Sequence, residues 1–251
     1  MNTAFKTTAA LAALILGSQL FTSPALAGVG KISSPQVDKG AKEIELTGKY
    51  EIEEHGEDEY EWENELELEY GLTEKILLEL EAEVKKEHGE DTEYEKTAIG
   101  IRYELSEPGE WLVDTAVEAG YAFSGTGDAD KAKLELLLKK YLGDIEVLSN
   151  IELAREVGED AENGVELEAA LGGYYDFSEF LNVGVEYFAD FGNLSDDNGY
   201  SEQKHAIGPI IGSEIHLPGA LREIEFKLGY YQGISKAAAD GTIKYEIELE
   251  F

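Results

Sequence analysis

Polar and apolar residues alternate along most of the chain from residue 42 onwards. In residues 43–53, glutamate, threonine or lysine takes every second position, and residues 59–70 carry glutamate at every second position. Successive side chains of a strand point to opposite faces, whereas a helix spreads them around its circumference, so a period of two predicts strands. The pattern predicts about twelve strands, at residues 42–54, 59–71, 76–87, 94–105, 111–123, 131–142, 145–157, 164–176, 181–191, 204–216, 223–233 and 242–251.

The connections between the predicted strands alternate in length. Those after even-numbered strands are short turns, at residues 72–75, 106–110, 143–144, 177–180 and 217–220. Those after odd-numbered strands are mostly longer and strongly polar, as at 124–130 and 192–203. Short turns at one end and longer loops at the other are typical of bacterial outer-membrane barrels, which have an even number of strands. The expected fold class is all-β: a transmembrane antiparallel up-and-down β-barrel of about twelve strands.

Alternation alone leaves open which face of the barrel is apolar. A soluble, lipocalin-like barrel points its apolar rows inward, and an outer-membrane barrel points them outward. The rows fit the roughly 9–11 residues that a tilted strand needs to cross a bilayer. Aromatic residues gather near the strand ends, as interfacial girdles do: Tyr70, Tyr103, Trp111, Tyr175 and Phe177 near the short turns, and Tyr60, Trp62, Tyr121, Phe123, Tyr187 and Phe191 near the loops. Together these features favour the outward orientation.

The two ends of the chain carry signals for export and assembly. Lys6 precedes an apolar run at residues 9–16 and the small-residue stretch Ala25-Leu26-Ala27, so residues 1–27 are predicted to be a secretory signal peptide. Residues 28–40 then form a periplasmic N-terminal segment, and residues 41–251 form the outer-membrane barrel. The last strand stops on Phe251, similar to the terminal signal that such barrels present to the barrel assembly machinery. The predicted location is the cell outer membrane of a Gram-negative bacterium.

The polar face of the predicted barrel is strongly acidic. The formal net charge of −34 argues against binding to nucleic acid or to anionic lipid headgroups. The residues predicted to line a pore are Glu59, Glu61, Glu63, Glu65, Glu67, Glu69, Glu79, Glu81, Glu83, Lys96, Arg102, Lys133 and Lys139. In this arrangement an acidic wall faces a more basic one, and the acids outnumber the bases. Such a lumen attracts cations.

An acidic lumen favours a cation-preferring diffusion channel or porin-like transporter for small cationic or polar solutes. The alternative is a closed barrel with a structural or surface-interaction role, sealed by salt bridges between its own side chains. A soluble acidic periplasmic binding protein is compatible only with the inverted orientation. Outer-membrane lipids are the expected surroundings. The sequence alone leaves open whether residues 28–40 plug the pore, and it leaves the oligomeric state open.

The pentapeptide Glu-His-Gly-Glu-Asp occurs twice, at residues 54–58 and 87–91. Both copies fall at the loop end of a predicted hairpin. A repeated turn, in which the glycine supplies a positive φ, is therefore favoured over a metal site shared by His55 and His88. No metal ion or cofactor is expected.

The sequence contains no clear catalytic arrangement. No serine lies in a recognisable nucleophile setting, and the chain has no cysteine. Carboxylates are so frequent that pairs of them say nothing about acid–base catalysis. Asn64 and Ser149 fall on the predicted lipid face, where polar residues are unexpected, and a local error of register is the simplest explanation. The protein is not expected to be an enzyme.

Several short motifs resemble one known group of proteins. They are Leu72-Thr73-Glu74-Lys75, Lys140-Tyr141-Leu142-Gly143-Asp144, Gly208-Pro209, and the stretch Gly233-Ile234-Ser235-Lys236-Ala237-Ala238-Ala239-Asp240. Together they resemble outer-membrane proteins of the MetA-pathway phenol-degradation family, which are described as transporters. The resemblance implies a barrel and solute passage, and it carries no catalytic residues. The intensely acidic polar face sets this chain apart and argues against an aromatic substrate.

Overall fold

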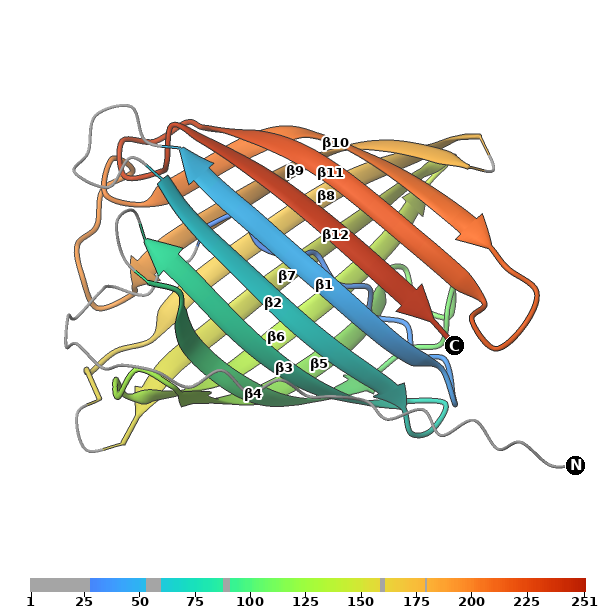
Figure 1. The fold of residues 1–251 in the computed structure, drawn as a ribbon, viewed down its shortest axis with the longest axis horizontal. Coiled ribbons are helices and arrows are strands. Elements are labelled where there is room, and N and C mark those ends of the chain that lie inside the picture. Colours follow the sequence, from blue (N-terminus) through green and yellow to red (C-terminus); the bar gives the residue numbers. More distant parts are fainter. Residues whose placement is uncertain (1–27, 53–59, 88–90, 159–160, 179) are drawn as a thin grey trace, which may run out of the picture.

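The computed structural model describes residues 28–52, 60–87, 91–158, 161–178 and 180–251. Twelve strands form the regular structure of these residues (Figure 1). Their bounds are β1 Lys42–Ile52, β2 Tyr60–Gly71, β3 Ile76–Glu87, β4 Glu93–Glu104, β5 Asp114–Ser124, β6 Asp130–Leu142, β7 Ile145–Val157, β8 Glu166–Ser178, β9 Leu181–Asn193, β10 Lys204–His216, β11 Glu223–Gly233 and β12 Gly241–Glu250. Among the described residues, no helix is long and apolar enough to cross a membrane.

Each strand pairs antiparallel with the next, and β1 pairs with β12 to close the barrel. The closing register places Glu45 opposite Glu248 and Gly48 opposite Tyr245. The predicted fold class, a closed antiparallel barrel of twelve strands, is confirmed.

The largest difference from the predicted strand bounds is at β5, which begins at Asp114 rather than at residue 111. Residues 105–113 form a longer turn in which Gly109 has a φ of +78°. The backbone N–H of Gly109 donates to Asp114 Oδ1 at 2.7 Å, and that of Thr115 donates to Ser106 Oγ at 2.9 Å. These side-chain acceptors hold the backbone of residues 106–113 in a turn. Trp111-Leu112-Val113 is apolar but does not pair, so hydrophobicity alone extended the predicted strand too far.

The apolar side chains of the strands face outward, as the sequence predicts. Ile99, Val185 and Ile211 are 50%, 54% and 47% exposed. On the opposite face of the strands, Glu67 is 5% and Glu81 is 4% exposed, because their side chains point into the barrel. A soluble barrel would show the reverse pattern, so the inverted orientation does not apply. An outward apolar surface with a charged interior is the arrangement of outer-membrane barrels.

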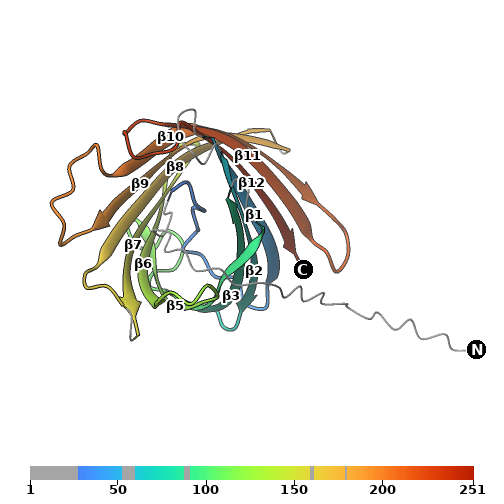
Figure 2. The same cartoon turned by 60° about the vertical axis from the view of Figure 1, so that its left-hand side comes forward.

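The N-terminal segment, residues 28–41, runs along the inside of the barrel, where Figure 2 shows it within the ring of strands. Gly28 and Val29 lie beside Lys204 and residues 237–239 at the loop end. At the short-turn end the backbone N–H of Gly40 donates to Gly71 O at 2.8 Å, and Gly40 has a φ of +83°. A glycine allows this left-handed turn into β1. Residues 28–40, expected on the periplasmic side, therefore lie within the lumen.

Candidate functional site

The candidate site is the interior of the barrel, where two large cavities lie. The loop-side cavity has a volume of about 340 Å³, and the turn-side cavity has a volume of about 330 Å³. Lys31 and Ser33 of the N-terminal segment line both of them. The two chambers therefore meet at this part of the segment.

Most side chains predicted to line a pore do point into the lumen. Glu63, Glu65, Glu67, Glu79, Glu81, Glu83, Lys96 and Lys133 line the loop-side cavity, and Glu69, Arg102 and Lys139 line the turn-side cavity. Glu61 pairs with Lys85 at 3.4 Å on the same face of β2 and β3. Glu59 lies outside the described residues. That these side chains border an ion path stays a prediction.

The N-terminal segment is held by polar groups from strands around the barrel. Its backbone carbonyls at Gly30, Ser33 and Ser34 accept hydrogen bonds from Lys244, Asn150 and Arg102, at 2.9, 3.4 and 3.3 Å. Further along, Lys139 donates to the side chain of Gln36 at 2.9 Å, and Glu104 accepts from the backbone N–H of Val37 at 3.1 Å. Near the loop end, Val29 packs against Ala170, Phe188, Ala206 and Tyr231. These contacts give the segment one defined path.

Lys31, a lysine of this segment, points at the wall formed by β1 and β2. Its Nζ lies 2.8 Å from Glu45 Oε2, 2.9 Å from Glu67 Oε2 and 3.6 Å from Glu69 Oε1. Burial lowers the pKa of Lys31, but attraction by these carboxylates outweighs burial and raises the pKa well above its usual value. The ammonium therefore stays charged while it is bound among acids.

Other bases pair with the acidic wall from directly beside it. Lys96 lies 2.8 Å from Glu81 Oε1 and 2.9 Å from Glu83 Oε2. Arg102 lies between Glu69, Glu79 and Glu118, at 3.4, 3.5 and 2.9 Å. The sequence predicts these bases on a wall facing the acids, but β4 pairs directly with β3, so neighbouring strands form the ion pairs instead. These salt bridges reduce the electric field that an acidic wall facing a basic wall would set up across the lumen.

A second buried cluster, centred on Glu186, was missed by the sequence analysis. Lys244 is fully buried and lies 2.8 Å from Glu186 Oε2 and 2.9 Å from Glu246 Oε1. Tyr174 donates to Glu186 Oε1 at 2.6 Å, and Tyr231 donates to Glu186 Oε2. Alternation indicates that each of these side chains faces the lumen. Their meeting depends on the curvature of the barrel, which alternation does not specify.

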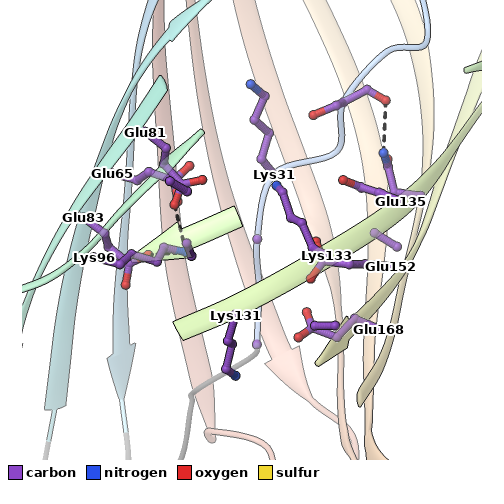
Figure 3. Close-up of a pocket in the computed structure, with 18 of the residues that line it drawn as sticks. Lys31, Glu65, Glu81, Glu83, Lys96, Lys131, Lys133, Glu135, Glu152 and Glu168 are labelled. Carbon is purple, nitrogen blue, oxygen red and sulfur yellow. Dashed lines mark hydrogen bonds and ion pairs between the residues drawn. The ribbon is translucent and has the colours of Figure 1, made fainter. Parts of the chain in front are cut away.

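Three carboxylates on the far side of the loop-side cavity have no base at close range. Glu135, Glu152 and Glu168 lie directly opposite one another on β6, β7 and β8. Among the residues that the structure describes, none forms an ion pair with them within 4.0 Å. Figure 3 shows these three on one side and Lys96 with Glu65, Glu81 and Glu83 on the other, with the N-terminal segment between. Glu81 and Glu83, which pair with Lys96, and the three carboxylates without such a partner thus lie on different sides of one cavity.

Three groups of acidic residues and histidine are close enough to suggest metal ligands. They are Glu65 with Glu81 and Glu83, Glu67 with Glu69 and Glu79, and Glu214 with His216 and Glu223. Lys96, Lys31 and Arg102 already form ion pairs with members of the first two groups. The predicted turn residues His55 and His88 lie outside the described residues, so the structure leaves the turn and metal interpretations of that motif untested.

The two polar residues predicted on the lipid face do lie on the outer face, so the register at both is right. Asn64 accepts a hydrogen bond from the phenol of Tyr245 and is only 8% exposed. Ser149 is partly covered on the outer face of β7. The suggested error of register is therefore wrong. Asn64 can lie on the lipid face because the aromatic side chain of Tyr245 covers its polar group.

Solved structures share this fold at low sequence identity. The COG4313 outer membrane channel from Pseudomonas putida F1 has a TM-score of 0.59 and is 12% identical, over 89% of this chain and 100% of that chain. The NanC porin has a TM-score of 0.56 and is 10% identical, over 83% of this chain and 98% of that chain. No protein-family model matches the chain, and the search of curated proteins found no match. The structural likeness identifies an outer-membrane type of β-barrel and, at this identity, shows the fold alone.

Proposed function

We propose that the protein is a porin-like outer-membrane channel that prefers cations and carries small cationic or polar solutes. The observation that carries the proposal is the surplus of acid in both chambers. Twelve glutamates and six lysines line the loop-side cavity. Two aspartates and eight glutamates, against three lysines and one arginine, line the turn-side cavity. A lumen with this imbalance concentrates cations and repels anions.

The outward apolar belt supports placement in the outer membrane, with lipid as the surrounding medium, and export by residues 1–27 agrees with it. The resemblance to the MetA-pathway phenol-degradation family and the likeness to two channel-type barrels point in the same direction. Unboiled protein in detergent should migrate differently from boiled protein, and cell fractionation should recover it with the outer membrane. Recovery as a soluble periplasmic protein contradicts the proposed location.

A closed structural barrel is the second candidate, because the N-terminal segment crosses the lumen and divides it. The two candidates differ in electrical behaviour. In planar bilayers a channel gives discrete current steps, and in a salt gradient its reversal potential shifts toward the cation value, most strongly at low salt because screening is weak there. The same electrical measurements are made on a matched variant that lacks residues 28–37. Absence of conductance in both proteins, although both are folded, favours the closed barrel.

A further inference from the structure

Two of the carboxylates around Lys31, Glu45 and Glu67, belong to a row that crosses five neighbouring strands. The register pairs Glu225 with Glu248, Glu248 with Glu45, Glu45 with Glu67, and Glu67 with Glu81. Like charges directly opposite one another destabilise a sheet. A row of this kind therefore requires cations to hold it.

Among the residues that the structure describes, lysines of the strands form ion pairs only with the two ends of this row. Glu225 pairs with Lys227 at 2.8 Å, and Glu81 pairs with Lys96 at 2.8 Å. At the centre, Glu45 and Glu67 instead pair with Lys31, which comes from the N-terminal segment and not from a strand. If the segment leaves, the central acids lose this cation while the ends keep theirs.

The central site has the chemistry of an ammonium receptor. A lysine ammonium has three N–H donors and no acceptor, and three carboxylates surround it here. The site lies where the two chambers meet, because Lys31 lines both. An ammonium group that enters from either chamber meets further carboxylates before this point.

On the basis of the proposed channel function, we infer that Glu45, Glu67 and Glu69 form a binding site for the ammonium group of linear organic amines, which Lys31 occupies as a tethered competitor. Soluble amines bind when they replace the Lys31 ammonium on the same three carboxylates. The segment thereby sets how much amine is needed for entry, since a ligand binds more weakly when only a fraction of its sites is available.

The test uses Lys31→Cys, which is selectively addressable because the chain has no cysteine. The folded protein is treated with either methyl methanethiosulfonate, which leaves a neutral side chain, or aminoethyl methanethiosulfonate, which restores an ammonium. The probe is spermidine, measured by its block of potassium current in planar bilayers and by calorimetric binding to the protein in detergent. The matched control is Lys39→Cys with the same reagents, because Lys39 is an exposed lysine of the same segment that pairs with Glu74.

We expect the methyl-capped Lys31→Cys protein to bind spermidine at least about tenfold more tightly than wild type, because the competitor is gone. Aminoethyl capping of Lys31→Cys should return the spermidine affinity to the wild-type value. Lys39→Cys with either reagent should change the spermidine affinity little. Glu67→Gln should lower it. Equal spermidine affinity in the methyl- and aminoethyl-capped proteins overturns the inference. The inference is also overturned if the methyl-capped Lys31→Cys protein gains as much affinity for magnesium ions as for spermidine, since the site would then respond to charge alone.

Calorimetry separates this inference from the proposed function, since it does not require current. Barrels that conduct cations but show no Lys31-dependent spermidine binding contradict the amine site and leave the channel standing. Barrels that bind spermidine as expected but never conduct contradict the channel and leave the site standing.

Discussion

The phenol of Tyr245 on β12 reaches across Gly48 on β1 and donates a hydrogen bond to the side-chain oxygen of Asn64 on β2. A Cβ at Gly48 would overlap the Tyr245 ring, so a glycine is needed beneath it. This contact lies on the outer face, over the junction where the first and last strands close the barrel. It joins three strands through one side chain.

Loss of this hydrogen bond should weaken the closing junction. Tyr245→Phe should lower the free energy of unfolding by about 1 kcal/mol, since the ring stays in place while the hydroxyl is lost. Gly48→Val should cost more, because it displaces the ring. Urea unfolding in detergent measures both. Tyr103→Phe, an outward tyrosine on β4, is the control, and an equal loss there would show that the closing junction has no special role.

The unpaired acids of the loop-side cavity should contribute more to cation preference than acids in salt bridges. Replacement of Glu135, Glu152 and Glu168 by glutamine removes three carboxylates and breaks no ion pair within 4.0 Å among the described residues. We expect the reversal potential in a salt gradient to move toward zero, with nearly unchanged conductance at high salt, where screening hides the charges.

The control for that triple variant has glutamine at Glu107, Glu110 and Glu162, which are exposed in connections outside the lumen. It changes the net charge of the protein equally. If both triple variants shift the reversal potential by the same amount, overall charge and not the luminal position determines selectivity.

Sequence reasoning succeeded where side-chain direction follows from local alternation. Residues such as Glu67 and Leu68 take opposite faces because a strand places neighbours on opposite sides. This holds along most of the strands and is interrupted where the register shifts, as between β3 and β4. Sequence reasoning failed where a contact joins residues far apart in the chain and one of them lies outside any alternating pattern. Residues 28–40 show no alternation, so nothing in them indicated that Lys31 meets Glu67, 36 residues further along the chain.

The acid–base pairing illustrates the same limit within the strands. Alternation placed Arg102 in the lumen but did not indicate that its register partner on β5 is Glu118. Register is set by the turns between strands, and the nine-residue connection from 105 to 113 is longer than the apolar pattern predicted. Ion-pair partners therefore require the structure.

Phe251 should matter for assembly more than for the finished fold. Its backbone N–H donates to Lys42 O at 2.9 Å, which extends the pairing of β12 with β1 by one bond. Deletion of Phe251 should lower the amount of folded protein in the outer membrane while leaving export unchanged, as measured by heat-dependent migration and fractionation. Phe177→Ala, at another exposed aromatic near the short turns, is the comparison. Unchanged folded yield after the deletion contradicts the role of the terminal residue.

Glu186 should hold the loop-side half of the N-terminal segment through Lys244. The carboxylate accepts from Tyr174, Tyr231 and Lys244, and Lys244 in turn donates to Gly30 O at 2.9 Å. Glu186→Gln keeps the size of the side chain but leaves Lys244 with only Glu246 as its anionic partner. Because removal of one partner from a buried ion pair leaves the other charge uncompensated, we expect a loss of about 2–3 kcal/mol in the free energy of unfolding.

The same variant should release the segment before the barrel unfolds. Limited proteolysis of the folded protein in detergent should cut within residues 28–37 faster in Glu186→Gln than in wild type, and spontaneous current steps should become larger or more frequent. Glu214→Gln removes a partly exposed acid near the short turn after β10 and should leave both properties unchanged. If Glu186→Gln lowers stability without faster cleavage of the segment, the cluster stabilises the wall of the barrel and has no role in holding the segment.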